Sequence, residues 1–177
     1  MAIKSMQELM LEELREIYSA ERLALRAYPR MRKAIRTQSL RDAVERHVEQ
    51  TKEQIGRLEQ MFELMDARTR AKTCRSMQGL LEEAQEHIDA DLSPELLEVM
   101  LVSDLQKIEH YEIAAYGSAK AHAQALGLQE AANLLEETLN EEKQTDELLN
   151  KIATQEINPQ ALGEQDEDEE ESAGHGG

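Results

Sequence analysis

The sequence predicts an all-α protein: four long helices packed as a bundle, with a short extra helix in the crossover between its two halves. Strong helix formers such as Ala, Leu, Glu, Gln, Lys and Arg dominate the composition, and the 177 residues include only 3 prolines and 8 glycines. Apolar residues also recur at spacings of three and four through long segments, which is the helical period. The single cysteine, Cys74, excludes an internal disulfide, so core packing must hold the fold.

Capping residues and helix breakers set the limits of the predicted helices. Ser5 is the predicted N-cap of the first helix, and Pro29 is expected to kink it. Ser39 is the predicted N-cap of the second, Ser93-Pro94 opens the third long helix, and Gly127 ends it. A basic loop precedes the short crossover helix. The predicted helices cover residues 5–37, 39–66, 75–90, 93–125 and 129–155.

Charge divides the chain into a helical bundle, residues 1–157, and an acidic tail, residues 158–177, whose composition predicts disorder. The net charge is −17, and the run 164–171 supplies seven acids without a single Lys or Arg. Such a charge argues against binding to nucleic acid or to anionic membranes. No segment approaches the ~20 apolar residues of a membrane span, and the N-terminus lacks the apolar region of a secretory signal. We therefore expect a cytoplasmic protein.

Each long helix carries polar, ligand-type side chains inside its own apolar stripe. Residues three, four and seven positions apart share a helix face, which places Glu21 in line with Ile17 and Leu14. The other three long helices repeat this pattern. Tyr18 and Tyr116 are further candidates to approach the same region, although core packing is the ordinary role of such side chains. The candidate metal ligands are Glu21, His47, Gln50, Glu109, Glu112, Glu142 and Asp146.

Carboxylates at a common depth in several helices favour a bound cation. A buried carboxylate is costly unless it is paired, protonated or bound to metal. A cluster of them repels itself, and a divalent or trivalent ion removes that repulsion. Oxygen ligands with one or two imidazoles suit iron or manganese. The alternative is that each acid reaches water at a helix seam or pairs with Lys or Arg, and that His47 is a buried histidine bonded to a carboxylate.

Four segments resemble the YciF/YciE family of bacterial stress-related, ferritin-like proteins. They are IYSAE (17–21), HVEQTKEQI (47–55), IEHYEIAAYGS (108–118) and LLEETLNEEKQTDELL (134–149). The resemblance covers about residues 5–155 and implies a ferritin-like bundle and a homodimer. It also implies a distant similarity to rubrerythrin, a di-iron peroxidase.

The similarity to rubrerythrin implies a role for each candidate ligand. Glu21 would be the ligand from the first helix, Glu109 and Glu112 would form the pair of acids one turn apart, and Glu142 would bridge two ions. Asp146 would stand near the usual histidine. His47 and Gln50 would stand where the second helix of rubrerythrin supplies Glu-x-x-His. This chain departs from the pattern at Gln50, because an amide is a poor bridging ligand.

Three hypotheses about function follow from these residues. The first is a redox metalloprotein that holds two iron ions, with manganese or zinc as alternatives, and reacts with O2 or peroxide under oxidative or metal stress. The second is a stress protein stabilised by metal without catalysis, which the amide of Gln50 favours. The third is a protein-interaction module that dimerises through its helix faces and recruits a basic partner with its acidic tail.

Overall fold

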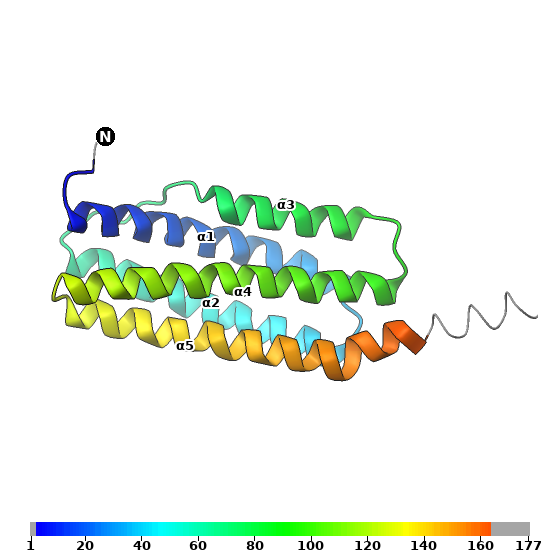
Figure 1. The fold of residues 1–177 in the computed structure, drawn as a ribbon. Helices are drawn as coiled ribbons and strands as arrows, with labels where there is room; N and C mark the ends of the chain where they lie inside the picture. The colour runs from blue at the N-terminus through cyan, green and yellow to red at the C-terminus, as the bar shows by residue number, and fades with distance from the viewer. Residues whose placement is uncertain (1–2, 164–177) are drawn as a thin grey trace, which may run out of the picture.

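The computed structural model describes residues 3–163, and this part of the chain is a bundle of helices without strands. The elements are α1 (Met6–Ala34), α2 (Gln38–Leu64), α3 (Arg75–Asp89), α4 (Pro94–Ala125), α5 (Gln129–Ile152) and the π-helix η1 (Ala153–Ile157). Helices α1 and α2 form one antiparallel pair, and α4 and α5 form the other (Figure 1). The short helix α3 lies in the crossover and packs against α1 and α4. The predicted all-α bundle is confirmed.

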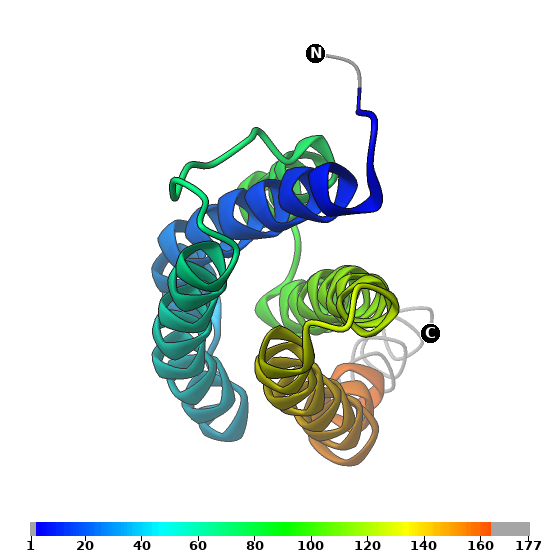
Figure 2. The ribbon, with the colours of Figure 1, turned by 90° about the vertical axis from the view of Figure 1, so that its left-hand side faces the viewer.

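The two helix pairs face each other across the bundle interior. Viewed along the bundle, α1 and α2 form one wall and α4 and α5 the opposite wall (Figure 2). The walls meet where α1 packs against α4 and where α2 packs against α5. All four long helices therefore border a single interior. Within residues 3–163, no helix combines the length and the hydropathy of a membrane span.

Three of the predicted helix boundaries depend on local interactions that the structure confirms. The hydroxyl of Ser5 accepts a hydrogen bond from the backbone N–H of Glu8 at 3.1 Å. The hydroxyl of Ser93 accepts one from Leu96 at 3.3 Å, with Pro94 in the first turn of α4. Gly127 follows α4 with a φ of 71°, a left-handed conformation that favours glycine.

The start of α2 differs from the prediction. Thr37 precedes the helix without a capping side-chain bond, and the prediction of Ser39 as the N-cap was wrong. Ser39 instead donates a hydrogen bond to Glu156 in η1 at 2.7 Å, a contact between residues far apart in sequence. The carboxylate of Glu98 on α4 holds this junction, because it accepts from two backbone N–H groups there at 2.6 and 2.8 Å. A distant buried acid thus binds the backbone of Arg36 and Thr37, directly before the first residue of α2.

The C-terminal limit of the bundle also lies further along the chain than predicted. Residues 158–163 continue as helix after η1. The predicted boundary after residue 157 therefore cuts through a helical segment. The acidic run 164–171 and the rest of the predicted tail lie outside the described residues.

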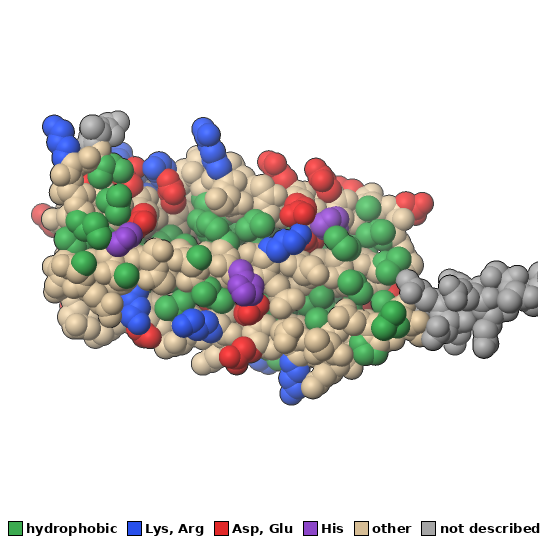
Figure 3. Space-filling view, viewed as in Figure 1, with side chains coloured by type: hydrophobic (Ala, Val, Ile, Leu, Met, Phe, Trp, Pro, Cys, Tyr) green, Lys and Arg blue, Asp and Glu red, His purple; other side chains and the backbone are tan. Residues whose placement is uncertain are grey.

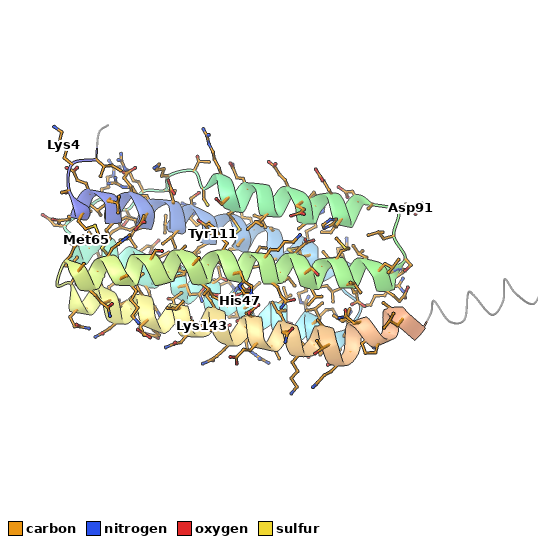
Figure 4. All side chains as sticks on the ribbon, in the orientation of Figure 1. Lys4, His47, Met65, Asp91, Tyr111 and Lys143 are labelled. Atoms are coloured by element: carbon orange, nitrogen blue, oxygen red, sulfur yellow. The ribbon has the colours of Figure 1, made fainter. Side chains whose placement is uncertain are left out.

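Two apolar clusters divide the core, with a polar layer between them. One cluster includes Tyr28, Leu105 and Leu149, and the other includes Leu14 and Phe62. On every long helix the polar layer occupies the gap between the two clusters. We define the polar layer by its buried side chains, which are Glu21, His47, Thr51, Gln54, Glu109, Glu112, Thr138, Glu142 and Thr145. Figure 4 places His47 about midway along the bundle, between the end marked by Met65 and the end marked by Asp91.

Candidate metal centre

Five ionisable side chains from all four long helices form the centre of the polar layer. Each has an exposed fraction of 2% or less. All five were predicted as ligands from their place in the apolar stripes. They are Glu21 of α1, His47 of α2, Glu109 and Glu112 of α4, and Glu142 of α5.

Four of these side chains can bring their ligand atoms together around one point. One ligand atom each from His47, Glu109, Glu112 and Glu142 lie within 4.8 Å of one another. Glu109 and Glu112 are three residues apart on α4, a spacing that places both on one face of a helix. His47 approaches from the opposite wall, with Nε2 at 3.2 Å from Glu109 Oε1 and 3.7 Å from Glu142 Oε2. Such a group has the size and composition to hold a metal ion.

Seven carboxylate oxygens of this group are buried without a hydrogen-bond donor. Both carboxylate oxygens of Glu109, Glu112 and Glu142 are buried without a hydrogen-bond partner, as is one oxygen of Glu21. His47 Nε2 also lacks a partner, so its contact with Glu109 is close but is not a hydrogen bond. Buried polar atoms in folded proteins are almost always satisfied. A bound cation, or protons shared between the carboxyls, would satisfy this set.

The protonation state of His47 suits a metal ligand. The Thr145 hydroxyl donates to the backbone carbonyl of Glu141 at 3.1 Å, which leaves its oxygen free to accept. His47 Nδ1 lies 3.4 Å from that oxygen and can donate its proton there. The tautomer that satisfies both contacts leaves the lone pair of Nε2 directed at the carboxylates. Burial lowers the pKa of His47 to about 4, so the ring is neutral at pH 7.

Burial raises the pKa of every carboxyl in the group, and repulsion within the group adds to this for three of them. For Glu21, Glu109 and Glu112, burial and then the charges of neighbouring carboxylates hold the pKa well above its ordinary value. Burial is also the main cause that raises the pKa of Glu142 to about 7. A cation in their midst would reverse these shifts, since it stabilises the ionised forms.

Two other buried acids on α4 have hydrogen-bond donors, as expected of carboxylates with a structural role. Glu98 accepts three hydrogen bonds from the α1–α2 junction. Asp104 lies 2.7 Å from Nδ1 of His87 and accepts from Lys107 at 3.2 Å. Both share the helical spacing of the apolar stripe of α4, although sequence reasoning did not single them out. Glu98 and Asp104 thus have hydrogen-bond donors, whereas Glu109 and Glu112 have none.

Tyr116 positions the ligand from α1. Its hydroxyl donates a hydrogen bond to Glu21 Oε1 at 2.5 Å, and the other oxygen of Glu21 has no partner. Both side chains are fully buried or nearly so. The predicted approach of Tyr116 to the site is confirmed, whereas Tyr18 donates to Glu59 at 2.8 Å, away from the five central residues.

Helix α2 contributes no carboxylate to the group of five. Gln50 is half-buried one turn from His47, and its interaction with the ring partly offsets the lowering of the His47 pKa by burial. Gln54 is buried and donates to Glu141 at 3.0 Å. Arg57 holds the same carboxylate through two hydrogen bonds of 2.7 and 2.8 Å. Amides and one imidazole thus stand where a second bridging acid would be expected.

Asp146 lies at the α4–α5 seam and not among the five central residues. Its Oδ2 is 3.3 Å from Nε2 of His110, whose side chain is 67% exposed. Its Oδ1 accepts from Gln106 at 3.4 Å. Histidines visible on this face of the molecule lie beside acidic side chains (Figure 3). The structure brings neither Asp146 nor Gln50 into the group of five, and their role as ligands stays a prediction.

The bundle and its core define a class of protein, a four-helix bundle with a buried carboxylate–histidine group that could hold a metal ion. Oxygen-rich donor sets with a neutral imidazole suit iron and manganese. The chain belongs to a family described as "Domain of unknown function (DUF892)", which matches residues 5–162.

The similarity to a curated protein and to its crystal structure agrees with the resemblance noted in the sequence. Protein YciF of Escherichia coli (strain K12) is 37% identical over 162 residues, which cover 91% of this chain and 98% of YciF. The crystal structure of YciF, described as a stress protein, matches with a TM-score of 0.85 over 88% of this chain and 99% of that one. The chain is therefore a homologue of a bacterial stress protein.

Two further solved structures share the fold. YcfI of Rhodopseudomonas palustris, provisionally described as a structural protein, is 35% identical and matches with a TM-score of 0.83 over 85% of this chain and 96% of that one. A protein of Xanthomonas campestris pv. campestris is 23% identical, with a TM-score of 0.72 over 91% of this chain and 99% of that one. The second likeness supports the fold alone.

Proposed function

We propose that the polar layer holds a pair of iron ions and that the protein reduces O2 or peroxide there, as part of a response to oxidative or metal stress. The observation that carries the proposal is the group of buried acceptors without donors. The residues that would hold the ions are Glu21, His47, Glu109, Glu112 and Glu142, and the last four already bring one ligand atom each within 4.8 Å of one another. A pair of ferrous ions supplies two electrons, the number that reduces peroxide to water.

The residues of the chain prepare this site for that chemistry. The two apolar clusters exclude bulk water from both ends of the polar layer, which strengthens every charge interaction inside it. Thr145 holds His47 in the tautomer that presents Nε2, and Tyr116 holds Glu21 through its hydroxyl.

An anaerobic titration with Fe(II) tests the proposal. We expect about two ions per chain, and then ferric absorbance in the near ultraviolet when O2 or peroxide is added. Glu109→Gln should lose iron, since an amide is a poor anionic ligand. Glu147→Gln, an exposed position on α5, is the matched control and should bind like the wild type. Wild-type protein that binds no iron in this titration would refute the proposal.

A second candidate function is a metal-stabilised protein without turnover. Two observations favour it: α2 provides Gln50 and Gln54 in place of an acid, and four ligand atoms within 4.8 Å are enough for a single ion. The description of YcfI as a structural protein is in line with it. One experimental result distinguishes the two functions. If iron-loaded protein consumes peroxide with a reductant present for more than one turnover per site, the non-catalytic function fails.

A further inference from the structure

The end of α1 and the start of α2 carry a concentration of positive charge. Residues 26–41 contain six Lys and Arg residues and no Asp or Glu, in a chain whose net charge is −17. They span the C-terminal part of α1, the α1–α2 junction and the first turn of α2. We define the basic junction by these six side chains, which are Arg26, Arg30, Arg32, Lys33, Arg36 and Arg41.

Neighbouring acids balance only part of the charge of the basic junction. Three of the six cations make ion pairs, at 2.8, 2.9 and 3.5 Å, with acids of α2, α3 and α4. The other three, which are Arg26, Lys33 and Arg41, have no ion pair with any residue that the structure describes. Arg26 and Lys33 are exposed, as is Arg36, whose side chain is 67% exposed. The basic junction therefore offers an excess of accessible positive charge to an anion.

The described part of the chain ends close to the basic junction. Glu156 of η1 accepts a hydrogen bond at 2.7 Å from Ser39, which lies within residues 26–41. Ile157 belongs to the same apolar cluster as Ile35. The helix continues from there to residue 163, which adds about 10 Å at the rise of an α-helix. Figure 1 likewise shows the end of the described chain at the same end of the bundle as the α1–α2 junction.

The residues that follow Gly163 are complementary in charge to the basic junction. The run 164–171 contains seven acids and no Lys or Arg. An extended chain covers about 3.3 Å per residue, so these residues can span about 26 Å, more than the helical segment that separates Gly163 from Glu156. A second basic segment, 68–75, follows α2 at the opposite end of the bundle, the end that Met65 marks in Figure 4. Reach therefore favours the basic junction over that segment.

We propose that the basic junction is the docking surface for the acidic run 164–171 of the same chain. The covalent link holds the run at an effective concentration on the order of 1 mM, so a contact of only millimolar affinity is already about half formed. Exposed charge pairs are individually weak and are screened by salt, so the contact should depend strongly on ionic strength. The docked run would link η1 to the α1–α2 junction and cover this surface against other polyanions. The inference involves no metal and is independent of the proposed function.

Paramagnetic broadening of amide signals in the full-length protein tests the docking. Cys74→Ser removes the native thiol, and Ser172→Cys provides the attachment point for a spin label directly after the acidic run. At about 10 mM salt, where the Debye length is about 30 Å, the signals of residues 30–41 should lose at least about half of their intensity. The signals of residues 68–75 should lose less. At about 1 M salt the Debye length falls to about 3 Å, and the difference between the two segments should disappear.

Two pairs of substitutions locate the docking surface. Lys33→Gln combined with Arg36→Gln should restore the signals of residues 30–41 at low salt. Arg68→Gln combined with Arg70→Gln removes the same charge from exposed positions at the opposite end of the bundle and should leave the broadening unchanged.

Three results would overturn the inference. The first is equal broadening of the two segments at low salt. The second is broadening of residues 30–41 that survives 1 M salt or the Lys33→Gln and Arg36→Gln pair. The third comes from a mixture of spin-labelled protein without nitrogen-15 and unlabelled protein that contains it. Broadening of residues 30–41 in that mixture, as strong as in the singly prepared sample, would show that the run docks on a second copy.

Discussion

Glu142→Gln tests the electrostatics of the polar layer without any metal. The substitution keeps the shape of the side chain and removes its charge. Burial raises the pKa of Glu142 from 4.5 to about 7 in the folded protein. At about 1.4 kcal/mol per pKa unit, this difference corresponds to about 3 kcal/mol. Because the side chain is 0% exposed, solvent screening reduces this figure little.

The sign follows from proton binding. Below pH 4.5 the carboxyl is protonated in the folded and unfolded states, so it has no effect on their balance. As the pH rises from 4.5 to about 7, the unfolded chain releases the proton first, and the wild type loses stability. Above pH 7 the loss stays constant. Glu142→Gln escapes it, so its free energy of unfolding relative to wild type should rise by about 3 kcal/mol across this window. The substitution also removes the Glu142 charge that raises the pKa of Glu109, and this too favours the stability of the variant at high pH.

Urea denaturation at pH 4.5, 6 and 8 in the presence of a chelator measures this difference. The pKa of about 4 for His47 means that the folded protein loses stability as the pH falls from 6.5 towards 4. This contribution is common to variant and wild type, so it cancels in the difference between their free energies of unfolding. Glu147→Gln is the exposed control and should run parallel to wild type at each pH. If Glu142→Gln also runs parallel to wild type between pH 4.5 and 8, the carboxylate group is not the buried, self-repelling cluster described above.

Three further substitutions test the contacts that support the site. Glu98→Ala should destabilise the protein by about 3 kcal/mol in urea denaturation, because it leaves the backbone N–H groups of the α1–α2 junction without an acceptor; a loss below about 0.5 kcal/mol would contradict this. Thr145→Val should weaken metal affinity about 10- to 100-fold in a competition titration, since His47 Nδ1 loses its acceptor, and unchanged affinity would show that the hydroxyl does not orient the ring. Tyr116→Phe should lower the stability of the metal-free protein by about 1 to 2 kcal/mol at pH 8, because Glu21 loses its donor; equal stability would show that the bond is not formed in solution.

Helical periodicity explains why most of the centre could be predicted from the sequence. Glu21, Glu109 and Glu142 share a face with neighbouring Leu and Ile residues on their own helices, and burying that face buries the acid with it. This inference needs no knowledge of which helices are neighbours. The same reasoning identified His47, because it shares a face of α2 with Val44 and Thr51.

The edges of a stripe depend on tertiary packing, and here the sequence is less informative. Glu112 and Asp146 both lie away from the centres of their stripes, yet Glu112 is 1% exposed and Asp146 turns to His110 at the α4–α5 seam. The packing of α4 on α5 decides between these outcomes, and no single-helix pattern contains it. The lack of a hydrogen-bond partner for the Tyr28 hydroxyl also depends on residues from other helices.

Contacts between distant residues account for the remaining differences. Ser39 has the sequence context of an N-cap, but Glu156 competes for its hydroxyl from more than a hundred residues away. The carboxylate of Glu98 on α4 instead binds the backbone N–H groups of Arg36 and Thr37, directly before α2. Local capping rules rank the residues near a helix start and contain nothing about such partners. Helical structure also continues past residue 157 in the described part of the chain, where η1 packs against α4.

The metal content of the protein tests the central claim most directly. Full-length protein purified without added metal, then loaded anaerobically with Fe(II) and passed through a desalting column, can be measured by elemental analysis against protein concentration. The buried acceptor group predicts about two iron ions per wild-type chain and a clear loss in Glu142→Gln. Wild-type protein that retains no metal after loading, with the same result in Glu142→Gln, would contradict the assignment of the polar layer as a metal centre.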